Sequence, residues 1–178
     1  MTEVLELAKR LMSARSVTPA TGSVFDELET MLKPLGFEVS RFTRGEGEEG
    51  TPEAPVENLF AIRKGPAGSR HFAFAGHLDV VPPGGGWTSD AFEPEIRGDL
   101  LYGRGAVDMK GGIACFLAAL ARVIGDKGTL PGSVSFLITG DEEGPAINGT
   151  VKLLDWAKAQ GHVFDACIVG EPTNPDAL

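Results

Sequence analysis

The feature that most constrains the fold of this chain is a regular alternation of short apolar segments with longer segments of helical periodicity. The apolar segments are rich in β-branched and aromatic residues, which is typical of strands. Strands are predicted at 37–43, 58–63, 71–76, 133–139 and 165–170, a hairpin at 95–103, and helices at 3–15, 23–35, 110–123 and 149–160. This alternation predicts an α/β domain with a mixed central sheet flanked by helices.

Composition narrows the range of partners. The chain has 178 residues, of which 42% are hydrophobic, and a formal net charge of -9. An acidic chain repels nucleic-acid phosphates and anionic membrane surfaces, so neither is an expected partner. The apolar run at 113–120 is too short to span a bilayer, and the N-terminus lacks the basic and apolar regions of a signal peptide. We therefore expect one domain in the cytoplasm, with a polar surface loop at 44–57.

The two cysteines, Cys115 and Cys167, do not form a metal-binding or disulfide pattern. They are far apart in the sequence, and neither belongs to a Cys-x-x-Cys pair. Cys115 lies in an apolar helical run and Cys167 in an apolar strand-like run. We therefore expect both to be buried free thiols.

Four segments place acidic or imidazole side chains beside Gly, at the end of a predicted strand or just before a predicted helix. They are 76–81 (Gly-His-Leu-Asp-Val-Val), 103–112 (Gly-Arg-Gly-Ala-Val-Asp-Met-Lys-Gly-Gly), 139–144 (Thr-Gly-Asp-Glu-Glu-Gly) and 169–173 (Val-Gly-Glu-Pro-Thr). Ligands of open α/β sheets bind beyond the carboxyl ends of the strands. The hypothesis is that all four segments meet in one crevice.

Convergence would gather an imidazole and several carboxylates within a few ångströms, namely His77, Asp79, Asp108, Glu143 and Glu171. Two like charges about 4 Å apart repel by roughly 4 kcal/mol at an effective dielectric near 20. Several such pairs would exceed the ~5–15 kcal/mol that stabilises a domain. Either some acids are protonated or cations neutralise the cluster. A mixed imidazole and carboxylate set suits Zn²⁺, Co²⁺ or Mn²⁺ better than Ca²⁺.

Each segment also has a simpler interpretation. Asp108 could cap the helix that follows it, the Asp-Glu-Glu run could be a solvated turn, and Glu171 could be a surface loop residue. Arg104 and Lys110 flank Asp108 in the sequence, and we favour their pairing with surface acids over a role in charge balance. Core packing is the favoured role of Trp87. The Gly-rich segment around Arg104 fits neither the Walker nor the dinucleotide fingerprint, so nucleotide binding is not expected.

Together the four segments resemble the signature of the co-catalytic metallopeptidase family, which includes aminoacylases, deacetylases, desuccinylases and glutamate-releasing carboxypeptidases. The similarity runs from about residue 70 to residue 175 and rests on the order and spacing of the segments. It implies a catalytic metal-binding domain, here its N-terminal part over 1–178, with two divalent metal ions, Zn or Co. It also implies that His77 and Glu171 bind one metal, that Glu143 binds the other, and that Asp108 bridges both, often with a cis peptide bond after it.

The resemblance also assigns the catalytic side chains. Asp79 would hydrogen-bond the far ring nitrogen of His77 and so fix its tautomer. Glu142 would be the general base, which takes a proton from the attacking water and returns it to the leaving amine. Within the family, the run at 141–150 most resembles the desuccinylase branch. That branch hydrolyses N-succinyl-L,L-2,6-diaminopimelate to succinate and L,L-diaminopimelate in lysine biosynthesis.

Two alternatives stay open at this point: another N-acyl amino acid amidohydrolase such as an acetylornithine deacetylase, or a non-catalytic metal-binding module. The family takes a further His ligand from near its C-terminus, and neither His71 nor His162 fits that pattern. It also carries a lid domain that forms a homodimer contact, which this chain lacks. We therefore expect an incomplete fragment that is nearly inactive alone, and a homodimer for the full-length protein.

Overall fold

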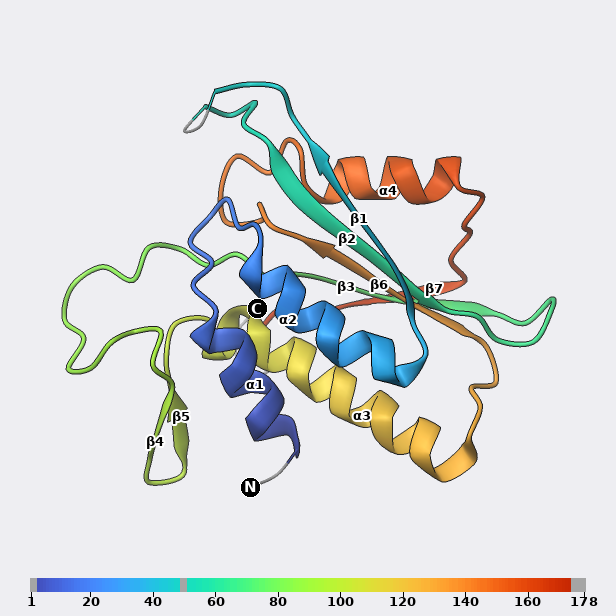
Figure 1. Cartoon of the computed structure of the whole chain (residues 1–178), viewed down its shortest axis with the longest axis horizontal. Coiled ribbons are helices and arrows are strands. Elements are labelled where there is room, and N and C mark those ends of the chain that lie inside the picture. The colour runs from blue at the N-terminus through green and yellow to red at the C-terminus, as the bar shows by residue number, and fades with distance from the viewer. Residues whose placement is uncertain (1–2, 49–50, 174–178) are drawn as a thin grey trace.

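The computed structural model describes residues 3–48 and 51–173, which form a mixed β-sheet with helices on both faces (Figure 1). Residues 49–50 of the predicted loop at 44–57, and the two ends of the predicted domain 1–178, lie outside the described residues. No helix in the described part of the chain is both long and apolar enough to cross a membrane.

All the predicted strands and helices are present, with ends shifted by a few residues. The helices are α1 (Glu3–Ser13), α2 (Ser23–Leu32), η1 (Lys33–Leu35), η2 (Ala106–Lys110), α3 (Gly111–Lys127) and α4 (Thr150–Ala159). The strands are β1 (Glu38–Arg44), β2 (Val56–Arg63), β3 (His71–His77), β4 (Glu95–Arg97), β5 (Leu100–Tyr102), β6 (Ser133–Thr139) and β7 (Ala166–Val169). The predicted hairpin is β4 and β5, which pair antiparallel as a separate two-stranded sheet.

The main sheet has the order β1-β2-β6-β3-β7. The pairs β1–β2 and β2–β6 are antiparallel, whereas β3 pairs in parallel with both β6 and β7. The predicted mixed sheet is therefore confirmed. Because β6, β3 and β7 run the same way, their carboxyl ends meet at one edge of the sheet. The chain goes from β3 to β6 on one side and then to β7 on the other, which makes the end of β3 a topological switch point.

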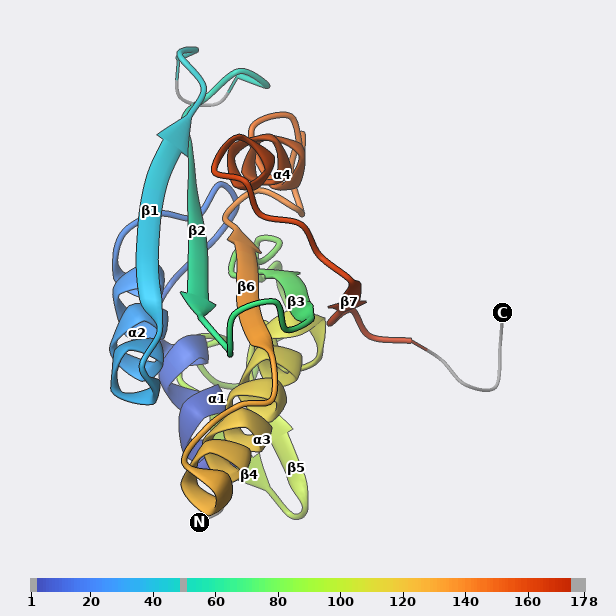
Figure 2. The ribbon, with the colours of Figure 1, turned by 90° about the vertical axis from the view of Figure 1, so that its right-hand side faces the viewer.

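The two crossover connections lie on opposite faces of the sheet (Figure 2). On one face α1, α2 and α3 cover a core that includes Phe25, Phe74 and Phe136. On the other face α4 buries Leu153 and Ala157 against Phe60 and Leu137. A right-handed parallel crossover leaves its helix on one face or the other according to the direction in which the chain moves along the sheet. The chain reverses its direction along the sheet at β6, which explains why α3 and α4 cover different faces.

Both cysteines are free but exposed, so the prediction of buried thiols was wrong. Cys115 falls on the outer side of α3, because the buried face of that helix is formed by Ile113, Leu117 and their neighbours. Cys167 lies on β7, where every residue is exposed. Successive side chains of a strand point to opposite faces, so neither face of β7 is covered by the described part of the chain.

Candidate metal centre

The candidate centre forms where three parallel strands end side by side. His77 is the last residue of β3, the Asp-Glu-Glu segment follows the end of β6, and Glu171 follows the end of β7. Asp108 comes from η2, at the start of the crossover helix that leads into α3. The structure thus brings together the four acidic segments, which are far apart along the chain.

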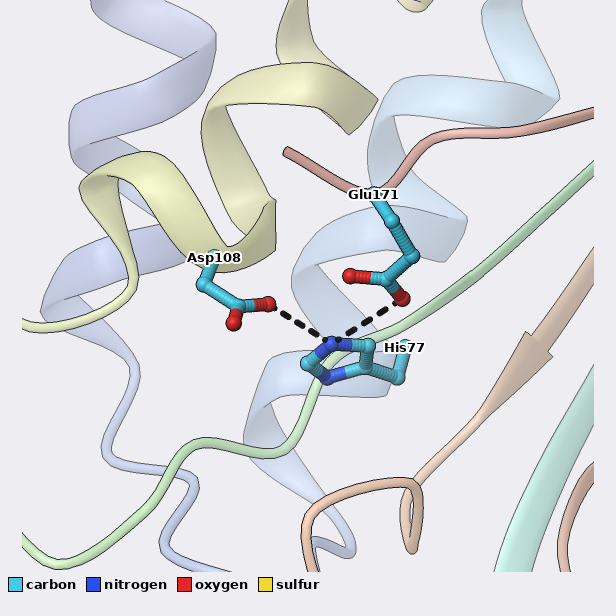
Figure 3. Close-up of side chains that lie close together, drawn as sticks. All are labelled: His77, Asp108 and Glu171. Carbon is cyan, nitrogen blue, oxygen red and sulfur yellow. Dashed lines mark hydrogen bonds and ion pairs between the residues drawn. The ribbon is translucent and has the colours of Figure 1, made fainter. Parts of the chain in front are cut away.

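The imidazole of His77 is at the centre of the acidic side chains (Figure 3). Its Nε2 atom lies 3.0 Å from Asp108 Oδ1, 3.5 Å from Glu171 Oε1 and 3.8 Å from Glu142 Oε2. Two sets of potential ligand atoms each lie within 4.8 Å of one another: one from His77, Asp108 and Glu171, the other from His77, Glu142 and Glu143. His77 is shared by both sets, whereas Asp108 belongs only to the first.

The opposite ring nitrogen of His77 faces Asp79. Nδ1 lies 2.9 Å from the backbone oxygen of Asp79 and 3.3 Å from its carboxylate, and both side chains are fully buried. Since both groups are acceptors, Nδ1 carries the proton, and Nε2 is directed at the acids. A neutral ring would then place a lone pair against carboxylate oxygens. A positive charge is therefore needed between Nε2 and these oxygens.

A proton on the ring could supply this charge. Burial alone would lower the pKa of His77, but the hydrogen bond to Asp79 and the charge of that carboxylate outweigh burial and raise the pKa to about 9. A metal ion would replace this proton and use the same lone pair.

The carboxylate of Asp79 has a second set of partners, which the sequence did not reveal. Its oxygens accept the backbone N–H of Glu142 at 3.1 Å and that of Glu143 at 3.0 Å. Burial raises the pKa of Asp79, but the hydrogen bonds from His77 and from these amides outweigh burial and hold the pKa below its ordinary value. One carboxylate therefore orients both the imidazole and the acidic turn.

The remaining acids repel one another. Burial raises the pKa of Glu143, and the charge of Asp108 raises it further. Burial also raises the pKa of Glu171, where the charges of Asp108 and Glu142 add to it against the opposing effect of His77. Within the described residues no Lys or Arg forms an ion pair with these acids. An imidazole nitrogen among under-neutralised carboxylate oxygens is a donor set that fits divalent zinc, cobalt or manganese.

Two glycines let the segment that carries Asp108 approach the strand ends. A Cβ atom at Gly76 would come within 2.3 Å of Met109 Cε, and one at Gly170 within 2.6 Å of the same atom. The sulfur of Met109 also accepts the backbone N–H of His77 at 3.2 Å. The peptide bond between Asp108 and Met109 is cis, which the family resemblance implies. Gly76 and Gly170 are thus explained by packing, because a larger side chain at either position would collide with Met109.

Lys110 does not pair with a surface acid, so the favoured interpretation was wrong. The side chain is fully buried, and Nζ donates to the backbone oxygens of Leu11 at 2.7 Å and Ala14 at 3.0 Å. These carbonyls belong to the end of α1 and the residue that follows it. Burial, only partly offset by the charge of Asp79, lowers the pKa of Lys110 to about 7. Through these hydrogen bonds Lys110 anchors the segment that carries Asp108 to the end of α1.

Arg104 and Trp87 also differ from their favoured interpretations. Trp87 is 36% exposed, so it is not a core residue. The guanidinium of Arg104 lies over the Trp87 ring, 5.6 Å from its centroid, and both side chains donate to the backbone oxygen of Pro83. Within the described residues Arg104 forms no ion pair with an acid.

Comparison with known proteins identifies the family. Residues 73–178 match the profile of peptidase family M20/M25/M40. The chain is 66% identical over 178 residues to a protein of Erythrobacter litoralis (strain HTCC2594) named succinyl-diaminopimelate desuccinylase, covering 100% of this chain and 46% of that protein. A desuccinylase of the same name from Novosphingobium aromaticivorans is 63% identical over 97% of this chain and 44% of its own length. The chain thus spans less than half the length of these relatives.

Solved structures share the fold. Human carnosine dipeptidase 1 superposes with a TM-score of 0.76 at 25% identity, covering 94% of this chain and 38% of that protein. The M20 family metallo-carboxypeptidase Sso-CP2 from Sulfolobus solfataricus gives a TM-score of 0.71 at 26% identity, covering 96% and 37%. Both are hydrolases of the peptide-bond class by name, and both are far longer than this chain.

Proposed function

The chain belongs to peptidase family M20/M25/M40, and from this premise we propose that it forms the metal-binding part of a succinyl-diaminopimelate desuccinylase. The reaction is hydrolysis of N-succinyl-L,L-2,6-diaminopimelate to succinate and L,L-diaminopimelate, a step of lysine biosynthesis in the cytoplasm. The observation that carries the proposal is the position of His77 Nε2, which lies within 3.0 Å of Asp108 Oδ1 and 3.5 Å of Glu171 Oε1. The names and identities of the relatives supply the substrate.

We assign the metal ligands as follows. His77 and Glu171 would hold one divalent ion and Glu143 the other, and Asp108, which lies with His77 and Glu171, would serve both. Zinc or cobalt suits this donor set. When bound, such ions acidify a water molecule and polarise the carbonyl of the scissile amide. The rest of the chemistry depends on the side chains of the chain itself.

Glu142 is assigned as the general base. Its side chain is 49% exposed, and Oε2 lies 3.8 Å from His77 Nε2, at the open side of the cluster. The carboxylate takes a proton from water as the bond from water oxygen to the amide carbon forms. When the carbon–nitrogen bond breaks, the same carboxylate gives that proton to the leaving amine. Asp79 keeps Glu142 in place through the backbone N–H of that residue.

We propose that the second metal takes a further ligand that the described residues do not supply. Within the described residues the other histidines lie at the opposite end of β3, where the rings of His71 and His162 are 5.8 Å apart. Neither can reach the ligands around His77. We therefore propose that the chain alone binds one metal ion more tightly than two and turns over little substrate. Full activity and homodimer formation would require the further length that the relatives have.

Metal analysis of the purified chain beside an Asp108→Ala variant tests the ligand set. The chain is expected to hold zinc or cobalt after dialysis, and the variant to lose most of it, because Asp108 contacts His77 directly. Asp126→Ala is the matched control, since Asp126 is exposed on α3 away from the cluster. Equal metal content in all three proteins would contradict the assignment.

The substrate is tested separately, on a version of the chain extended to the length of its relatives. Hydrolysis of N-succinyl-L,L-diaminopimelate is expected to be much faster than hydrolysis of N-acetylornithine. The reverse preference would assign the protein to another N-acyl amino acid hydrolase. Bound metal without hydrolysis of either compound would indicate a non-catalytic metal-binding module.

A further inference from the structure

Beside the candidate metal centre, Arg104 keeps hydrogen-bond donors without acceptors. The guanidinium carries five N–H groups, and its one hydrogen bond in the described part of the chain goes from Nη2 to Pro83 O at 3.1 Å. Its Nε atom is buried and has no hydrogen-bond partner. A buried donor without a partner is destabilising. Such groups are rare in native proteins, where ordered water or a ligand usually supplies the partner.

The position of Arg104 is nevertheless fixed. Its backbone N–H donates to Ala91 O at 2.7 Å, and its side chain is held between Pro83 O and the Trp87 ring. Pro83 O also accepts the indole N–H of Trp87 at 2.8 Å, so one carbonyl anchors both side chains. Little side-chain freedom remains to be lost when a ligand binds, which favours affinity.

Arg104 and two of the proposed metal ligands, Asp108 and Glu143, line the same hollow. A space of about 430 Å³ has Trp87, Arg104, Asp108 and Glu143 among its lining residues. This volume is in the range of small-molecule sites. A ligand in the hollow would therefore meet the guanidinium and the proposed metal ligands at the same time.

Charge decides which ligand fits. The chain has a net charge of -9, and the acids of the metal centre repel anions unless metal ions neutralise them. The proposed substrate carries carboxylates away from the scissile amide, and metal ions at that amide do not neutralise them. An arginine pairs with a carboxylate through two parallel hydrogen bonds. No other Lys or Arg in the described part of the chain lines this hollow.

We propose that Arg104, held against Trp87, binds a carboxylate of the substrate in this hollow and so places the scissile amide at the metal centre. The assignment rests on the proposed function, because that function supplies a substrate with carboxylates. It makes Arg104 a binding residue that selects anionic N-acyl groups or amino acid carboxylates over neutral ones.

The two tryptophans of the chain give a direct test. Trp87 touches Arg104, whereas Trp156 stacks on Phe42 on the far side of the sheet and serves as an internal reference. Succinate is titrated into the zinc-loaded chain while the indole N–H signals are followed by NMR. The Trp87 signal is expected to shift with saturation and the Trp156 signal to stay, and neutral succinamide is expected to move neither.

Variants identify the arginine. Arg104→Gln is expected to weaken succinate binding about ten- to hundredfold, the usual effect of losing a charged hydrogen bond, and Arg104→Lys to restore part of it. Arg44→Gln is the matched control, because Arg44 also lies over an aromatic ring, Phe42, and donates to a backbone oxygen, Thr43 O, but away from the hollow. Its succinate affinity is expected to stay within about twofold of the unmodified chain.

Zinc affinity is measured on the same proteins, so that the two proposals can fail separately. Zinc binding without a Trp87 response, or equal succinate affinity in Arg104→Gln and the unmodified chain, would overturn the role of Arg104 alone. A Trp87 response in a chain that binds no zinc would overturn the proposed metal centre alone. Thermal unfolding of each variant shows whether it is folded, and Arg104→Lys keeps the test valid if Arg104→Gln is not.

Discussion

The carboxylate of Asp79 accepts the backbone N–H of Glu142 through both of its oxygens, each at 3.1 Å. The same carboxylate lies 3.3 Å from Nδ1 of His77. The end of β3 and the turn after β6 are therefore joined by a single buried anion. This joint sets the position of the imidazole and of the proposed base relative to each other.

Replacing Asp79 by Asn is expected to weaken both connections. The amide keeps one acceptor oxygen but has no charge, so the pKa of His77 falls and the turn at Glu142 loses part of its anchor. Changes of this kind behind a metal-binding His cost about 10–100-fold in metal affinity, which calorimetry with zinc measures. Asp155→Asn, at an exposed position on α4, is the control. Unchanged zinc affinity in Asp79→Asn would show that the joint does not support the centre.

Replacing Gly76 by Ala is expected to disturb the candidate metal centre through Met109. The Cβ atom of Ala would meet Met109 Cε at 2.3 Å, and because Met109 is fully buried beside Asp108, its displacement moves that carboxylate. Gly76→Ala should therefore lower both zinc affinity and stability, the latter by about 1–3 kcal/mol. Gly125→Ala is the matched control, since nothing lies within 4 Å of its Cβ on α3 and Ala there should stabilise by up to about 1 kcal/mol. Urea unfolding and calorimetry measure the two effects.

Lys110 should contribute to stability through α1. Lys110→Met keeps the length of the side chain but removes the donors that satisfy Leu11 O and Ala14 O. We expect a loss of about 1–3 kcal/mol in the free energy of unfolding, measured by urea denaturation. Lys127→Met, at the exposed end of α3, should change it by no more than about 0.5 kcal/mol. Equal stability of the two variants would mean that the buried ammonium contributes nothing.

Acid should destabilise the chain through His71, at the start of β3, and its neighbour His162. Burial lowers the pKa of His71, and the nearby His162 lowers it further; burial also lowers the pKa of His162. Because both folded pKa values lie below the unfolded value of about 6.5, the unfolded chain takes up protons first as the pH falls. Stability should therefore be lost as the pH falls through about 6.5.

His162→Phe removes one of these groups and keeps an aromatic ring beside Phe60. Its free energy of unfolding should fall less than that of the unmodified chain between about pH 7.5 and about pH 5.5, measured by urea denaturation. Contributions of His77 and of the carboxylates are common to both proteins and cancel in the comparison. Parallel pH profiles would refute the assignment.

Much of the fold was predictable because apolar periodicity is a local property of the sequence. The strand that ends at His77 and the helix after Asp108 were placed correctly. Three of the four acidic segments lie at strand ends, as expected. Their gathering could be anticipated because the carboxyl ends of parallel strands lie at one edge. The order in which the strands pair was not predictable, since it depends on contacts between distant residues.

The misjudged residues share a physical cause. A lysine or arginine is usually solvated, so periodicity gave no reason to bury Lys110 against the end of α1 or to place Arg104 on an indole ring. The backbone contacts of Asp79 leave no trace in side-chain patterns. Cys167 looked buried because β7 is apolar, but apolar residues at a sheet edge are buried only when something covers them. Each of these contacts depends on segments distant in the sequence.

The place of β3 between β6 and β7 has a consequence for how the chain folds. Both neighbours of β3 are made later than β3 itself, so on a ribosome this strand emerges with neither edge paired. The backbone groups of residues 71–77 can form their sheet hydrogen bonds only after residues 133–139, and then residues 166–169, have been synthesised. Pairing over such separations is slow, and an apolar strand with open edges is prone to aggregate meanwhile. The arrangement that creates the crevice therefore also makes its central strand the one most in need of protection during synthesis.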